Sequence, residues 1–293
     1  MNQLKEQGMK IVFLIAACTS VVAVAFICIF LFANGIPAIG KIGVADFLLG
    51  ETWRPSNDIY GILPMILGSI YVTAGAVILG VPIALLTSVF LAHYCPKKLY
   101  RPLQSAVSLM AGVPSVVYGF FGLVMIVPTM QSITGRDGSN MLTASILLAI
   151  MILPTIISVT EAAIQSVPES YYEGSLALGA THERSIFCTI IPAAKSGIIA
   201  GIVLGIGRAI GETMAVIMVA GNQARMPAGL LRGVRTLTAN IVLEMGYAAD
   251  LHREALIATG VVLFVFILII NLAVSLLNLS LIHISEPTRL ALI

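Results

Sequence analysis

Residues 141–160 read MLTASILLAIMILPTIISVT and contain no charged side chain. A helix of about 20 apolar residues, at a rise of about 1.5 Å per residue, crosses the hydrocarbon core of a bilayer. Lipid offers the backbone no hydrogen-bond partner, so a spanning segment satisfies its peptide groups internally as a helix. The stretch therefore predicts a transmembrane helix.

Stretches of the same kind recur along the chain. No Asp, Glu, Lys or Arg occurs in 11–40, 59–96, 102–135 or 255–285, and 196–224 is interrupted only by Arg208 and Glu212. The first run is longer than the core of a signal peptide, so we expect it to be a retained helix. We predict an all-α membrane protein with six transmembrane helices, over residues 11–33, 62–92, 104–130, 141–161, 197–221 and 256–278.

Composition excludes several classes of protein. The chain is 58% hydrophobic and 10% charged, whereas soluble domains carry about 25% charged residues. A net charge of +2 is too small to favour nucleic-acid binding. The four cysteines form no CxxC pair and the four histidines are scattered, so we expect no catalytic, cofactor or metal site.

Basic residues in the short loops indicate the orientation. Five lie before the first predicted span or after the second, against three in the loops on the other side, so residues 1–10 are predicted to be cytosolic. The four arginines of the 222–255 loop oppose this assignment. The five cytosolic residues are Lys5, Lys10, Lys97, Lys98 and Arg101.

The predicted cytosolic loop between the fourth and fifth spans carries helix signals. Ser166 to Glu169 fits a capping box with proline in the first turn. Gly179 is expected to end this first short helix, Thr181 to cap a second one, and Pro192 to close it. The alternative is a plain amphipathic loop.

Residues 35–41, GIPAIGK, match the first positions of a phosphate-binding P-loop. The next residue is Ile42, where Ser or Thr would bind magnesium, and no strand is predicted before the stretch. We therefore expect no nucleotide site here and no ATP hydrolysis by this chain.

The fifth predicted span combines small residues with two charges. Gly197, Gly201, Gly205 and Ala209 recur every fourth residue, a pattern that lets another helix approach closely. On a continuous helix, Arg208 and Glu212 fall on the same side of the span, so both are predicted to face the bundle. Such charges are costly in a membrane unless paired or hydrated. They form either a structural ion pair or part of an anion pathway, and the two roles are compatible if the pair opens.

Residues 112–122, GVPSVVYGFFG, combine Pro114 with three glycines and predict a bent, closely packed helix. Ser115 and Tyr118 place two hydroxyl groups there. These hydroxyls either line a pathway or belong to a simple packing kink.

The segment from Glu173 through Gly179 to Pro192 resembles the EAA motif of permeases from ATP-driven (ABC) importers. Gly174-Ser175 stand where that motif has Ala-Ala, and Thr189 where Ile is usual. The resemblance implies that the 166–192 loop forms coupling helices that dock on an ATPase subunit. Glu173, Gly179, Ala180 and Pro192 are the residues expected to serve this coupling.

Further runs resemble phosphate-specific permeases, of the PstC type in particular, over about residues 10–278. The resemblance implies a type I ABC importer permease fold over 11–278 and a role for Arg208, Glu212 and Thr213, with Ser115 and Tyr118, in phosphate passage. The runs are 53–55, 60–64, 112–122, 152–155, 207–216 and 235–238.

The same resemblance implies the setting of the protein. It would lie in the bacterial cytoplasmic (inner) membrane with a second homologous permease subunit, two ATPase subunits and an extracytoplasmic phosphate-binding protein. The tail 279–293 departs from the pattern and is predicted to be non-native. Three alternatives stay open: a permease for another oxyanion or small solute, an ion-driven secondary transporter, and a non-transporting scaffold.

Overall fold

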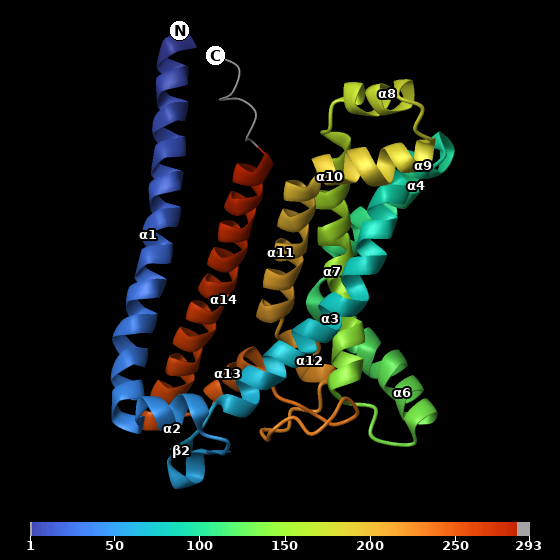
Figure 1. The fold of residues 1–293 in the computed structure, drawn as a ribbon. Helices are drawn as coiled ribbons and strands as arrows, with labels where there is room; N and C mark the ends of the chain where they lie inside the picture. The colour runs from blue at the N-terminus through green and yellow to red at the C-terminus, as the bar shows by residue number, and fades with distance from the viewer. Residues whose placement is uncertain (1, 286–293) are drawn as a thin grey trace.

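The computed structural model describes the backbone of residues 2–285 and the side chains of residues 6–273. Within this range, five helices are long and apolar enough to cross a membrane, and the number is six when a pair of helices bent by 69° is counted as one span. Figure 1 shows most of them crossing between the same two ends of the molecule. The spans are Glu6–Ile42, Leu63–Tyr94, Ser115–Thr134, Met141–Gln165, Asp250–Ala273, and the bent pair His182–Ala193 with Lys195–Gly211.

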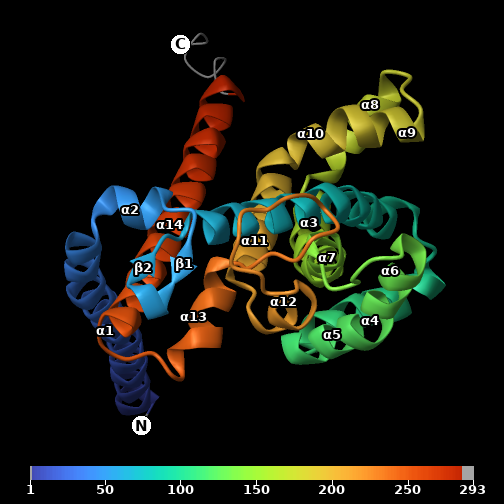
Figure 2. The ribbon, with the colours of Figure 1, turned by 90° about the horizontal axis from the view of Figure 1, so that it is seen from below.

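Helix α7 (Met141–Gln165) is the centre of the bundle. Asn140 caps it, accepting a hydrogen bond from the Thr143 backbone amide at 3.0 Å. Helices α3 (Leu63–Val89) and α11 (Lys195–Gly211) pack along it, and Figure 2 shows α7 end-on among its neighbours. The predicted span at 141–161 is therefore confirmed.

Helices α1 (Asn2–Ile42) and α14 (Asp250–Ser285) lie side by side at one edge of the bundle (Figure 1). A Cβ on Gly35 would lie 2.5 Å from Val261 Cγ2, so glycine permits this close approach. The stretch 35–41 is helical throughout, as part of α1, and forms no loop. The tail predicted to be foreign continues α14 to Ser285, and residues 286–293 lie outside the described residues.

The third predicted span is not one continuous helix, so the bounds 104–130 are wrong. Helix α4 (Lys97–Gly112) ends at an extended Val113, with ψ of 127°, because a residue before proline disfavours the helical conformation. The chain resumes after Pro114 as α5 (Ser115–Phe121), a π-helical turn over Gly122–Ile126, and α6 (Val127–Thr134).

The fifth predicted span is also broken, and a continuous helix over 197–221 is wrong. Helix α11 ends at Gly211, and Glu212 is extended with ψ of 131°. Helix α12 (Met214–Val219) follows after Thr213. Glycine at 211 weakens the helix there, and the Glu212 side chain bonds to the first turn of α12 instead of continuing α11.

The 166–192 loop folds into short helices at one end of the molecule, α8 (Glu169–Ala177), α9 (His182–Ser185), a π-helical turn over Ile186–Ile190 and α10 (Ile191–Ala193). Gly179 ends the first with φ of 85°, and the Thr181 side chain caps the second, as predicted. The capping box is wrong, because Ser166 Oγ donates backwards to the Ala163 carbonyl at 2.8 Å. Pro192 is inside α10, which ends one residue later.

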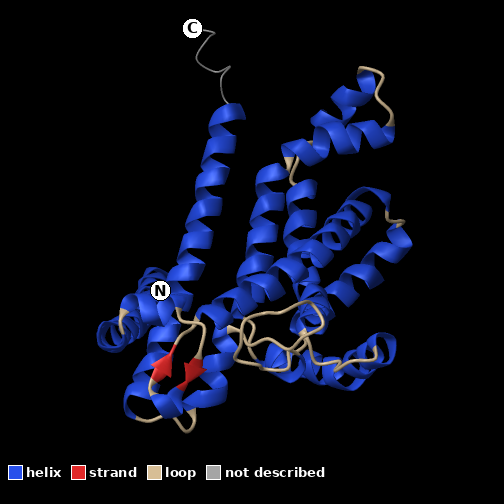
Figure 3. Cartoon of the chain, turned by 60° about the horizontal axis from the view of Figure 1, so that its bottom comes forward, coloured by secondary structure: helices blue, strands red, loops and turns tan. Residues whose placement is uncertain are grey.

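The opposite end holds α2 (Val44–Leu49), α13 (Leu237–Met245) and a small hairpin of β1 (Trp53–Arg54) and β2 (Ile59–Tyr60). The strands are antiparallel with Trp53 opposite Tyr60, and Figure 3 shows them in red. A 3-10 turn over Pro55–Asn57 joins them. The all-α expectation did not include this hairpin.

Candidate functional site

The glycine face of α11 packs directly on α7. A Cβ on Gly205 would lie 2.6 Å from Ile156 Cγ1, and one on Gly201 would lie 3.1 Å from Thr160 Oγ1. A Cβ on Gly197 would overlap Ala163. Ala209 continues the face and is buried. The predicted close helix approach is confirmed, and it fixes the rotation of α11 that positions Arg208.

Arg208 is half-buried near the end of α11. Its Nη1 donates to Thr155 Oγ1 on α7 at 3.3 Å. Among the described residues, no carboxylate lies within ion-pair distance of its guanidinium. The charge thus faces the bundle with a single hydroxyl for a partner.

Glu212 lies in the break between α11 and α12. Its Oε1 accepts a hydrogen bond from the Ala215 amide at 3.2 Å, and its carbonyl accepts one from Thr238 Oγ1 at 3.0 Å. Thr213 Oγ1 donates to the Gly211 carbonyl at 3.2 Å. The i,i+4 ion pair between Arg208 and Glu212, one of the two alternatives left open by the sequence, does not form here, because the helix that would align them ends at Gly211.

The other broken helix lies against this break. Helix α5 packs on α12, and a Cβ on Gly119 would lie 2.9 Å from the Ala215 Cα. Tyr118 Oη donates across its own break to the Met110 carbonyl at 2.9 Å. Ser115 is the first residue of α5 and is half-buried. The structure thus gathers Arg208, Glu212 and Tyr118 around two interrupted helices.

The residues predicted for coupling lie apart from this group, on the short helices. Glu173 and Pro192 are exposed. Gly179 and Ala180 line a depression of about 380 Å³ together with Arg184 and Cys188. Leu178 beside them is 91% exposed, so the tip of the loop presents an apolar side chain to its surroundings.

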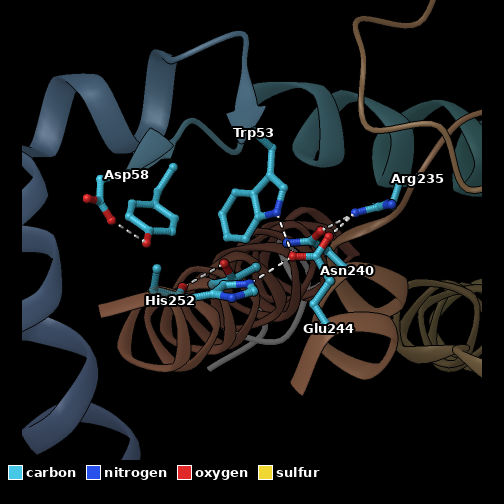
Figure 4. Close-up of polar contacts among 9 residues, drawn as sticks. Trp53, Asp58, Arg235, Asn240, Glu244 and His252 are labelled. Atoms are coloured by element: carbon cyan, nitrogen blue, oxygen red, sulfur yellow. Dashed lines mark hydrogen bonds and ion pairs between the residues drawn. The ribbon is translucent and has the colours of Figure 1, made fainter. Parts of the chain in front are cut away.

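A buried polar cluster lies beside the β1–β2 hairpin and was not predicted from the sequence (Figure 4). Arg235 forms an ion pair with Glu244 Oε1, and Glu244 Oε2 accepts a hydrogen bond from Trp53 Nε1 at 2.8 Å. His252 Nε2 lies 2.8 Å from the same oxygen, and Arg235 Nη1 also donates to Asn240 Oδ1 at 3.0 Å. We call Trp53, Arg235, Asn240, Glu244 and His252 the Glu244 cluster.

The Glu244 cluster ties the hairpin to α13 and α14. Trp53 and Tyr60 are both buried, and the Tyr60 ring lies against the rings of Trp53 and His252. Burial, the hydrogen bond to Asp58 and the charge of Asp58 raise the pKa of Tyr60 to about 12, so its hydroxyl stays protonated. The partners lie up to 191 positions apart in the chain, so no local pattern could have revealed them.

Comparison with known proteins identifies the family. The profile of the binding-protein-dependent transport system inner membrane component matches residues 80–283. The phosphate transport system permease protein PstC of Mesorhizobium japonicum is 35% identical over 276 residues, 87% of this chain and 84% of that protein. The probable ABC transporter permease protein YqgH of Bacillus subtilis is 37% identical over 281 residues, 92% of this chain and 91% of that protein.

Solved structures share the fold. A chain of the inward-facing MetNI methionine ABC transporter aligns with a TM-score of 0.62 at 19% identity, covering 78% of this chain and 99% of that one. A chain of a bacterial alginate ABC transporter aligns at 0.61 and 16% identity, covering 91% and 95%. The predicted type I importer fold is confirmed, and the chain belongs to the family of binding-protein-dependent transport system inner membrane components, the permeases of ABC importers.

Proposed function

We propose that this chain is the permease subunit of an ATP-driven importer of inorganic phosphate. It forms half of the translocation pathway, together with a second homologous permease, and couples to two cytosolic ATPase subunits. An extracytoplasmic phosphate-binding protein delivers the substrate. The relatives named as PstC phosphate permeases support this choice of substrate.

The observation that carries the proposal is the state of Arg208. A charged side chain within a membrane costs several kcal/mol unless it is paired or hydrated. Arg208 has one neutral hydrogen-bond partner and no carboxylate among the described residues. A guanidinium presents a planar set of donors that fits two oxygens of a phosphate, which makes it a ready binding group for that anion.

Glu212 gives the site a means of releasing the anion. Its carboxylate lies in the break between α11 and α12 rather than within a helix, and it repels phosphate while attracting Arg208. In another state of the transporter, it competes with phosphate for the guanidinium. The hydroxyls of Ser115, Tyr118 and Thr213 supply neutral donors that bind an oxyanion without trapping it.

The short helices α8 to α10 couple the permease to the ATPase subunits. The N-terminal end of α1 and the loop that carries α8 to α10 lie at the same end of the molecule (Figure 1), as expected if both are cytosolic. ATP-driven closure of the ATPase subunits moves this loop and switches the pathway between inward-open and outward-open states. Such a switch requires ligands that bind the two states unequally, here ATP and the loaded binding protein.

The test is phosphate uptake by the assembled transporter in proteoliposomes. We expect Arg208→Gln to assemble normally and to lower uptake by about 100-fold, because two charge-assisted hydrogen bonds contribute roughly 3 kcal/mol or more. Arg136→Gln, at an exposed turn, is the matched control and keeps normal uptake. Wild-type uptake by Arg208→Gln would refute the pathway role, and uptake of a different oxyanion after exchange of the binding protein would refute phosphate selectivity of this subunit.

A further inference from the structure

Helix α4 carries a continuous polar face that the functions described above do not use. With about 100° between successive residues, six polar side chains fall within about 120° of its circumference. All six are exposed. We call this face the α4 stripe; it consists of Lys97, Lys98, Arg101, Gln104, Ser105 and Ser108.

The other faces of α4 are directed toward the protein core or toward lipid. Tyr100 and Val107 pack toward the core around α7, and Tyr100 Oη donates to Glu161 Oε1 at 2.7 Å. Leu99 and Leu103 lie on the face of α4 opposite the stripe and are 52% and 39% exposed, as expected of side chains that meet lipid. Hydroxyl and amide groups turned toward hydrocarbon would have no hydrogen-bond partners. The α4 stripe therefore faces water or a polar ligand.

One end of the α4 stripe lies near the 166–192 loop, and the other end lies near the helices around Arg208. Just before its first residue, the ring of Tyr94 contacts that of His182, with centroids 5.1 Å apart, so the basic end is beside the short helices of the 166–192 loop. Beyond its last residue, the Met110 carbonyl accepts the hydrogen bond from Tyr118 of α5, and α5 packs on α12, the helix that follows Arg208 and the break at Glu212. The stripe thus spans about 17 Å between the Arg208 site and the coupling end.

The chemistry along the stripe is graded. Nearest to Arg208 are Ser108, Ser105 and Gln104, which offer neutral donors and, together with the exposed Leu109, line a shallow depression of about 430 Å³. At the coupling end are three cations, which raise the local concentration of anions at the mouth of a passage. An oxyanion that leaves Arg208 would first meet neutral hydrogen-bond donors, which bind it weakly. It would then meet cations, which attract it toward the end of the stripe near the 166–192 loop.

We propose that the α4 stripe is the inner half of the anion pathway, the surface along which phosphate passes from Arg208 to the cytosol. This inference rests on the proposed function and extends it to six further residues. The competing occupant is the headgroup of an anionic lipid, which shares the phosphate chemistry. The following experiment separates the two.

Cysteine accessibility in the assembled transporter tests the stripe directly. Cys18, Cys28, Cys95 and Cys188 are all free and are first replaced by serine. Single cysteines are then introduced as Ser105→Cys and Ser108→Cys, with Ala106→Cys on the lipid side as the matched control. An anionic, membrane-impermeant thiol reagent is applied from the ATPase side of proteoliposomes made of neutral phosphatidylcholine.

We expect Ser105→Cys and Ser108→Cys to react about tenfold faster than Ala106→Cys, a difference of roughly 1.4 kcal/mol in activation free energy. Inorganic phosphate should slow both reactions more than chloride at the same ionic strength. Replacing Lys97, Lys98 and Arg101 together by glutamine should lower phosphate uptake several-fold in these neutral vesicles while the complex still assembles.

Two results would overturn the assignment in a complex that does take up phosphate. One is equal reactivity at the three positions, or no protection by phosphate. The other is a loss of uptake in the triple variant that occurs only in vesicles containing anionic lipid, which would make the stripe a lipid-binding surface. A complex with the unaltered chain that takes up no phosphate would instead refute the proposed function.

Discussion

Two arginine–glutamate combinations in this protein behave in opposite ways. Arg208 and Glu212 are four residues apart on what the sequence presents as one helix, yet they make no ion pair. Arg235 and Glu244 are nine residues apart and are joined directly, with Trp53, Asn240 and His252 completing their hydrogen bonds (Figure 4). The first pair straddles a broken helix, whereas the second is enclosed between α13, α14 and a hairpin.

The difference shows that arginine and glutamate can either stabilise the fold as a pair or leave the arginine available to bind a ligand. Buried charges that are paired and hydrogen-bonded lock their surroundings, because removing one partner leaves the other uncompensated. A cation with one weak partner remains available for a ligand. We therefore assign the Glu244 cluster to stability and Arg208 to substrate, and each prediction below tests one side of that contrast.

The largest expected effect on stability is at Glu244. Glu244→Gln leaves the half-buried Arg235 without a counter-charge, so the free energy of unfolding should fall by about 3 kcal/mol. Thermal or denaturant unfolding of the purified protein in detergent measures this change. Glu212→Gln is the matched control and should change stability by about 1 kcal/mol or less. Equal losses in the two variants would erase the contrast between the pairs.

A glycine comparison tests the surface that positions Arg208. Gly205→Ala places a Cβ 2.6 Å from Ile156 and should destabilise the protein by about 1–3 kcal/mol through overpacking of α11 on α7. Gly207 has no neighbour within 4 Å of a built Cβ, so Gly207→Ala should be neutral or slightly stabilising. Unfolding measurements that rank the two variants in the reverse order would contradict the helix contact.

The 166–192 loop, which we propose couples the permease to the ATPase subunits, offers a third test, in which transport and stability separate. Gly179 has φ of 85°, a conformation that costs a side-chain-bearing residue about 1–2 kcal/mol. We expect Gly179→Val to distort the turn between α8 and α9 and to leave ATP hydrolysis in the complex while phosphate uptake falls. Gly174→Ala, within α8 and free of close neighbours, should keep the normal ratio of uptake to hydrolysis. An unchanged ratio in Gly179→Val would argue against a coupling role.

The smallest effect is expected at the edge of the Glu244 cluster. Trp53→Phe keeps the aromatic ring but removes the Nε1 hydrogen bond to Glu244, which retains Arg235 and His252 as partners. The free energy of unfolding should fall by about 1–2 kcal/mol, below the loss in Glu244→Gln. A double-mutant cycle of the two positions measures their coupling. A coupling near zero would show that the hydrogen bond contributes nothing.

Much of the fold could be predicted from charge-free runs alone. The stretch 141–160 is long and apolar, and it forms the central helix α7, which runs through Pro154 without a break. The spans predicted at 104–130 and 197–221 are wrong because each contains a residue pattern that interrupts a helix. The number of apolar residues alone does not reveal that pattern. Val113 precedes a proline, and Glu212 follows Gly211 and caps a new helix, so both breaks come from backbone chemistry rather than hydrophobicity.

The candidate site was predictable only in part. The glycine repeat placed Arg208 toward α7, because helical spacing alone sets that rotation. The position of Glu212 was not predictable from the same spacing, since it depends on where α11 ends. The Glu244 cluster depends on contacts between segments far apart in the chain, and a lone tryptophan in a loop gives no sign of a carboxylate partner on α13.

The most direct test of the account is the position of phosphate in the assembled, substrate-loaded transporter. A high-resolution cryo-EM map should show a phosphate within about 3 Å of the Arg208 guanidinium, at hydrogen-bond distance, with Arg235 still paired to Glu244. A map that shows Arg208 turned toward lipid, or bound to Glu212 while phosphate occupies another part of the passage, would contradict it.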